Sequence, residues 1–180
     1  MRRMSVVVSV IALVSLLMVS GVPTARAQEG ATAGHPLVGS WLVVISFEGR
    51  DPGAPLPLKL TSLVTFFADG NVLVANAGQL SPLPPGAGLF FTEGHGQWIA
   101  TGENSADVTY NSLVLDQTGG LSSITTARTS VKVDATRNAY TGTFVIDSAN
   151  PAGNATGTER GTLSATRIRV EPAGTPAAST

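Results

Sequence analysis

The chain has no cysteine, and among its 180 residues there are two histidines and 13% charged side chains. No disulfide, cysteine-linked lipid anchor or thiolate metal site can therefore form, and stability must come from a packed core. His35 and His95 make no spaced ligand pair, so the sequence predicts no metal site. Hydrolase and nucleotide-binding signatures are also missing, and the sequence predicts no cofactor.

The first 27 residues have the pattern of an export signal. Arg2 and Arg3 precede an apolar run over 6–19, which is too short to span a bilayer, and Ala25-Arg26-Ala27 fits a cleavage site before Gln28. This pattern predicts a secreted, periplasmic or otherwise extracytoplasmic protein without stable membrane insertion after cleavage.

Basic charge is scarce in the remaining chain. Removing residues 1–27, with their three arginines and no acid, leaves 8 basic and 12 acidic residues and a net charge of −4. Nucleic acids attract clustered positive charge, so they are not expected as partners. The length fits one domain, which we place at 37–170, after a disordered lead-in at 28–36 and before a disordered tail at 171–180.

Alternating apolar and polar residues predict an all-β domain. Short turn signals such as Asp69-Gly70 separate the predicted strands and favour antiparallel pairing of neighbours along the chain. Eight strands in this order predict a closed up-and-down β-barrel, with a β-sandwich as the alternative. The predicted strands cover 38–48, 59–68, 71–77, 94–102, 108–115, 121–134, 140–147 and 156–170.

The strand at 121–134 has two possible inner faces. Arg128, Lys132 and Asp134 belong in water, so we predict that the opposite set faces inward. That set is Ser123, Thr125, Ala127, Thr129, Val131 and Val133.

Gly39-Ser40-Trp41 in the first strand, with Arg167 near the end of the last, resembles the lipocalin and calycin arrangement. The resemblance implies an eight-stranded barrel in which an arginine packs over the tryptophan at the closed end; Arg169 could serve equally. Gly39, Trp41 and Arg167 are therefore our structural candidates. It also implies a small hydrophobic ligand inside the barrel.

Candidate site residues are the aromatic residues that could border such a ligand, together with one histidine. His95, flanked by glycines, could be a general base or bind a polar ligand group, or it could be a hydrogen-bonded turn residue. Leu89, Phe90 and Phe91 could begin a strand or form a hydrophobic lid. The ligand-binding candidates are Phe67, Phe90, Phe91, His95, Trp98 and Tyr110.

Three functions fit this sequence. The first is binding of a small hydrophobic molecule, the second is a barrel cyclase or isomerase acting on a flexible substrate, and the third is an interaction module with a filled barrel. Small inward side chains would favour the first function, and large ones would favour the third.

Overall fold

A computed structural model describes residues 32–49, 59–76 and 90–174. Residues 1–31, which contain the predicted export signal, and Leu89 lie outside these ranges. Within them, no helix is long and apolar enough to cross a bilayer. The strands are β1 (Gly39–Phe47), β2 (Lys59–Phe66), β3 (Asn71–Asn76), β4 (Phe90–Phe91), β5 (Gly94–Ala100), β6 (Ser105–Leu115), β7 (Leu121–Val133), β8 (Ala139–Ala149) and β9 (Ala155–Arg167).

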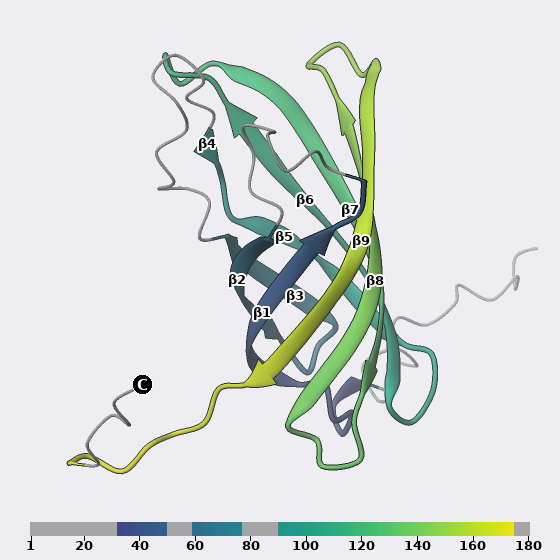
Figure 1. Ribbon diagram of the computed structural model, residues 1–180, viewed down its shortest axis with the longest axis vertical. Coiled ribbons are helices and arrows are strands. Elements are labelled where there is room, and N and C mark those ends of the chain that lie inside the picture. Colours follow the sequence, from purple (N-terminus) through teal and green to yellow (C-terminus); the bar gives the residue numbers. More distant parts are fainter. Residues whose placement is uncertain (1–31, 50–58, 77–89, 175–180) are drawn as a thin grey trace, which may run out of the picture.

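The strands form a closed, eight-stranded antiparallel barrel (Figure 1). β4 and β5 pair with successive parts of the same edge of β6, so together they occupy one strand position. Apart from β4, which pairs with β6, the strands pair in chain order, and β9 closes the ring on β1, with Trp41 opposite Arg167. The predicted all-β up-and-down barrel is confirmed, and Phe90 and Phe91 lie in a strand.

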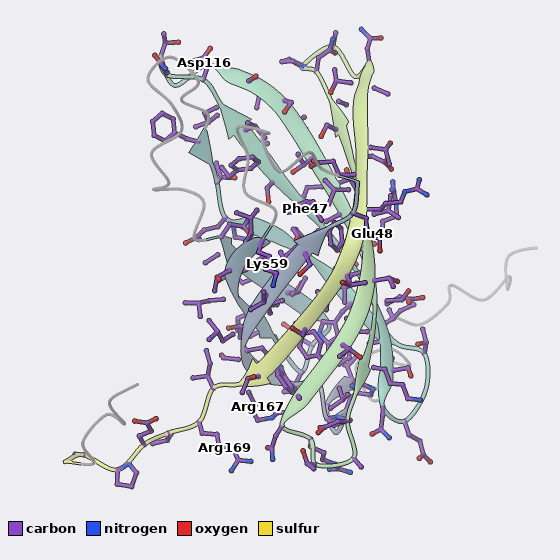
Figure 2. The ribbon with its side chains drawn as sticks, viewed as in Figure 1. Phe47, Glu48, Lys59, Asp116, Arg167 and Arg169 are labelled. Atoms are coloured by element: carbon purple, nitrogen blue, oxygen red, sulfur yellow. The ribbon has the colours of Figure 1, made fainter. Side chains whose placement is uncertain are left out.

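The two ends of the barrel differ in height. We call the end with Trp41 and the 67–70, 101–104 and 134–138 turns the closed end, and the end with the 116–120 and 150–154 turns the open end. β6–β9 have 11 to 13 residues each, whereas β1–β3 have six to nine. Figure 2 shows the result: Asp116 lies at the top of the long strands, far above Phe47 and Lys59 at the ends of β1 and β2.

The closed end is a packed core. Four aromatic residues, each at most 3% exposed, form what we call the aromatic floor: Trp41, Phe66, Trp98 and Tyr140. The rings meet edge-on, with centroids 4.8 Å apart for Trp41–Tyr140 and 5.9 Å for Phe66–Trp98. The Trp41 Nε1–H donates to Leu37 O at 2.8 Å and the Trp98 Nε1–H to Phe67 O at 3.0 Å, so neither indole leaves a buried donor unpaired.

A turn before β1 crosses this end. Thr32 Oγ1 donates to Ala68 O at 2.5 Å, and the His35 ring bonds Gly102 O through Nε2 at 3.1 Å. Leu37, fully buried, donates its backbone N–H to His35 Nδ1, which requires the neutral ring with its proton on Nε2. We expected a disordered lead-in over 28–36. From Thr32 onward the chain is instead packed, because the side chains of Thr32, His35 and Leu37 fill the end of the core.

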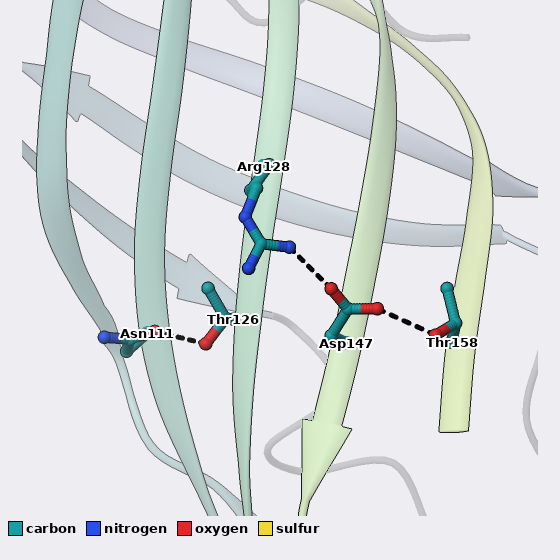
Figure 3. Close-up of polar contacts among 5 residues, drawn as sticks. All are labelled: Asn111, Thr126, Arg128, Asp147 and Thr158. Carbon is teal, nitrogen blue, oxygen red and sulfur yellow. Dashed lines mark hydrogen bonds and ion pairs between the residues drawn. The ribbon is translucent and has the colours of Figure 1, made fainter. Parts of the chain in front are cut away.

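The outer wall of β6–β9 is polar. Arg128 Nη1 donates to Asp147 at 2.5 Å, and Thr158 donates to the other oxygen of the same carboxylate at 2.7 Å (Figure 3). Thr126 donates to Asn111 at 2.8 Å nearby. The exposed Arg128, together with buried Ala127, Val131 and Val133, confirms the predicted inward face of β7.

Candidate functional site

Two strands of the open half, β7 and β8, have an accessible inner face. Along β7, burial alternates strictly from Ala127 to Val133, but the four residues Ser123–Thr126 are all half-buried. Along β8, the five residues from Val145 to Ala149 are half-buried in the same way. When consecutive residues are equally accessible, both faces of the sheet have accessible surface. The inner face of β7 and β8 therefore becomes accessible toward the open end, whereas on the neighbouring β6 the inner residues Ser112 and Val114 are each 3% exposed.

Small hydroxyl-bearing side chains and a few apolar ones line this region. The alternation of each strand places Ser123 and Thr125 of β7 and Ser148 of β8 on the inner face. The apolar lining includes half-buried Phe47, Leu60 and Ile146, which pack against the core. Phe47 also meets Phe144 edge-on at 5.3 Å. An apolar lining with a few polar groups is typical of small-molecule sites.

Tyr110 lies on the inner face of β6, against the glycines of β5. A Cβ atom at Gly96 would lie 1.9 Å from Thr109 O, and one at Gly94 would lie 2.7 Å from Tyr110 Cδ2. A larger residue at Gly96 would collide with the backbone of β6, and one at Gly94 would displace the side chains of Tyr110 and Ser112. The two glycines thus provide the space that the Tyr110 ring occupies.

The two tyrosines are uncharged at neutral pH. Burial raises the pKa of Tyr110 to about 12, and burial together with the nearby Tyr110 raises the pKa of Tyr140 further above its usual range. Neither hydroxyl has a hydrogen-bond partner among the described residues. The interior therefore offers neutral phenol groups rather than phenolates.

Ser112 and Ser62 add buried hydroxyls. Ser62 Oγ donates to Asn76 Oδ1 at 2.7 Å. Ser112 is 3% exposed, and its Oγ has no hydrogen-bond partner in the described structure. A buried, unpaired hydroxyl costs free energy, so Ser112 requires a separate explanation.

The structure places three of the six predicted ligand-binding residues inside the barrel and three outside. Tyr110 faces the interior, and half-buried Phe91 pairs with buried Val114 near the open end. Trp98 belongs to the floor rather than to an accessible pocket wall. These placements leave Tyr110 and Phe91 as the predicted residues that can border a ligand in the open half.

The other three predicted residues lie outside. Phe67 is 45% exposed in the turn at the closed end, and Phe90 is 48% exposed beside Leu115. His95 is exposed because it alternates with inward Gly94 and Gly96. It cannot act as a general base on a molecule in the interior, and we do not retain it in the site. Glycines carry no apolar signal, so the sequence of β5 did not reveal which of its faces points inward.

The three structural candidates come together at the closed end. Arg167 Cζ lies 4.1 Å from the centroid of the Trp41 ring, and its Nη1 donates to Val38 O at 2.9 Å. Its remaining donors reach Arg137 O and Pro36 O. Gly39 has φ +125°, and a Cβ there would lie 2.7 Å from Arg167 Nη1. Arg169 instead reaches Asn138.

Residues that the sequence analysis missed include Ser112 and Tyr140. The signal for Ser112 was a lone serine on the apolar face of β6, between Tyr110 and Val114. Tyr140 likewise lies on the same face of β8 as Phe144, and exposed Thr141 and Thr143 lie on the other face. Both patterns were visible, but only the closed barrel shows that these strands share one interior.

The molecule belongs to the class of closed, eight-stranded antiparallel barrels, a fold compatible with the lipocalin-like arrangement. Comparison with protein-family models finds no match, and comparison with curated proteins finds no significant similarity. Among the described residues, no group of three or more histidine, cysteine or acidic side chains could hold a metal ion.

Proposed function

We propose that this protein is an exported binding protein that holds one small hydrophobic molecule in the open half of its barrel. One observation carries the proposal: along β7 and β8 the buried–exposed alternation stops toward the open end, and the inner face becomes accessible. Eight-stranded barrels have room for one small ligand when their inner side chains do not fill them. Here the closed half is filled, whereas the inner positions Ser123, Thr125 and Ser148 near the open end are small and half-buried.

The apolar lining favours an apolar ligand. Phe47, Leu60 and Ile146 present carbon surface from three strands, and removing such surface from water is worth about 25 cal/mol per Å². The long strands β6–β9 extend this inner surface above the ends of β1 and β2 (Figure 2). A molecule held there would have walls on the tall side of the barrel.

A filling variant tests the site. Thr125→Trp would place an indole on the inner face of β7, whereas Thr126→Trp would place one on the outer face next to Asn111. We expect purified wild type and Thr126→Trp to bind an environment-sensitive apolar dye, and Thr125→Trp to lose at least about tenfold in affinity. Equal binding by both variants would locate the dye elsewhere. No binding by wild type of the dye or of a panel of lipids and polyketides would count against the function.

Export is part of the proposal and is supported by the sequence of residues 1–27. Intact-mass measurement of the protein from the extracytoplasmic fraction tests it. We expect a mature chain that begins at Gln28. Full-length protein confined to the cytoplasmic fraction would contradict export without affecting the binding site.

A further inference from the structure

Ser112 Oγ is the buried polar atom that the packing of the barrel does not explain. Its side chain is 3% exposed and lies on the inner face of β6, among Tyr110, Val108 and Val114. Its backbone is satisfied in the sheet, where Ser112 O also accepts a bond of 3.2 Å from Thr125 Oγ1. The hydroxyl proton alone has no acceptor among the described residues.

The edge of the Tyr110 ring lies beside Ser112. A Cβ built on Gly94 would lie 2.9 Å from Ser112 Oγ and 3.1 Å from Tyr110 Cε2. Two groups that are each about 3 Å from one point are neighbours. The absence of a side chain at Gly94 therefore leaves the Ser112 hydroxyl and the edge of the Tyr110 ring together on the inner wall.

The charge around this pair is low. The described inward positions of β5, β6 and β7 carry no ionisable group other than Tyr110. On β9, Glu159 occupies an inward register position opposite Ile146, in the same row of paired residues as Ala127 and Tyr110. A carboxylate ligand would lose its hydration without gaining a cation, and it would share the interior with an acid. A neutral oxygen needs only a hydrogen-bond donor.

We infer that Ser112 and Tyr110 form a polar anchor that binds the buried end of a neutral ligand, a mainly apolar molecule with one carbonyl oxygen. In this arrangement the Ser112 Oγ–H donates to the ligand oxygen, and the Tyr110 hydroxyl provides a second donor. The inference rests on the proposed function and adds the chemical class of the ligand. It also explains why a serine occupies an apolar face of β6, where alanine would pack without an unpaired hydroxyl.

A matched series of probes tests the ligand class. The affinities of 2-decanone, decane and decanoate would be measured at neutral pH by displacement of an apolar dye. We expect 2-decanone to bind about tenfold more tightly than both other probes, because one buried hydrogen bond has about that effect on affinity. Equal affinity for 2-decanone and decane, or tightest binding of decanoate, would overturn the anchor while leaving the proposed function in place. Failure of all three probes and the dye to bind would overturn both.

Variants assign the anchor to its residues. Ser112→Ala should lower the 2-decanone affinity about tenfold, leave the decane affinity unchanged and raise the melting temperature of the free protein, since it removes an unpaired buried hydroxyl. Ser164→Ala, on the exposed outer face of β9, is the matched control and should change none of these. Tyr110→Phe should lower 2-decanone affinity with the same fold retained. If both Ser112→Ala and Tyr110→Phe keep the wild-type preference for 2-decanone over decane, the anchor is wrong.

Discussion

Strand β7 runs through both halves of the barrel. Near the closed end its inner face carries Val131 and Val133, which are at most 5% exposed and belong to the core. Near the open end the same face carries Ser123 and Thr125, which stay half-buried. The backbone pairing with β6 and β8 continues along both halves. The hydrogen-bond ladder is therefore the same in both halves, and what differs is how deeply the inner side chains are buried.

We expect the two halves to differ most in how much stability is lost when a large inner side chain is replaced by alanine. Trp41→Ala should lower the free energy of unfolding by about 3–5 kcal/mol, because the indole is fully buried and leaves a large cavity. Ile146→Ala, in the half-buried lining, should cost about 1–2 kcal/mol. Chemical denaturation of both variants measures the difference. Equal losses would mean that the open half is packed as tightly as the floor.

Trp98→Ala should behave like Trp41→Ala. The sequence placed Trp98 among the residues that border a ligand, but its side chain is 1% exposed and its indole N–H donates to Phe67 O. We therefore expect a loss of about 3–5 kcal/mol. A Trp98→Ala protein with wild-type stability and impaired dye binding would restore the pocket interpretation.

The cover of the closed end depends on Arg167. Arg167→Ala removes donors to the carbonyls of Pro36, Val38 and Arg137 and the contact with Trp41, and should cost about 2 kcal/mol. Hydrogen exchange should show faster exchange of the Val38 amide. Arg167→Lys retains the charge but not the planar fork, and should recover only part of the stability. Unchanged dye binding in both variants is expected, because the contacts lie below the floor.

Alkaline titration compares a tyrosine of each half. A tyrosine whose folded pKa is raised contributes a stability that is complete below the unfolded pKa and is lost as pH rises through the folded one. For Tyr110 this window runs from about pH 10 to about pH 12, and the loss is on the order of 2 kcal/mol. Tyrosinate absorbance measures the titration. Tyr110→Phe should lower the pKa of Tyr140, since Tyr110 contributes to raising it. An ordinary tyrosine titration near pH 10 would contradict the burial of both rings.

The smallest effect should come from the outer wall. Asp147→Asn removes the ion pair with Arg128. The Arg128 side chain is 57% exposed and the Asp147 side chain is 44% exposed, so we expect no measurable change in melting temperature at physiological salt. Hydrogen bonds from Thr158 and Arg128, together with the Arg128 charge, lower the pKa of the Asp147 carboxylate. Any stability that this carboxylate adds to the fold is therefore present above the ordinary carboxylate pKa and is lost as pH falls. A clear drop in melting temperature would show that the wall stabilises the barrel more than its exposure indicates.

The sequence by itself determined the all-β class, the strand order and the inner face of β7, because side chains alternate along a strand and charged ones remain in water. It also identified Trp41 and Arg167, which the structure brings into contact. Only the tertiary structure decided that His95 lies outside, that Trp98 joins the floor and that residues 32–38 cover the closed end. Alternation assigns residues to faces within one strand, but the closure of the ring decides which faces meet. At the start of β5, glycines alternate with polar residues, so hydropathy does not indicate which face points inward. In the closed barrel Gly94 and Gly96 face inward, where they make room for the ring of Tyr110 on β6.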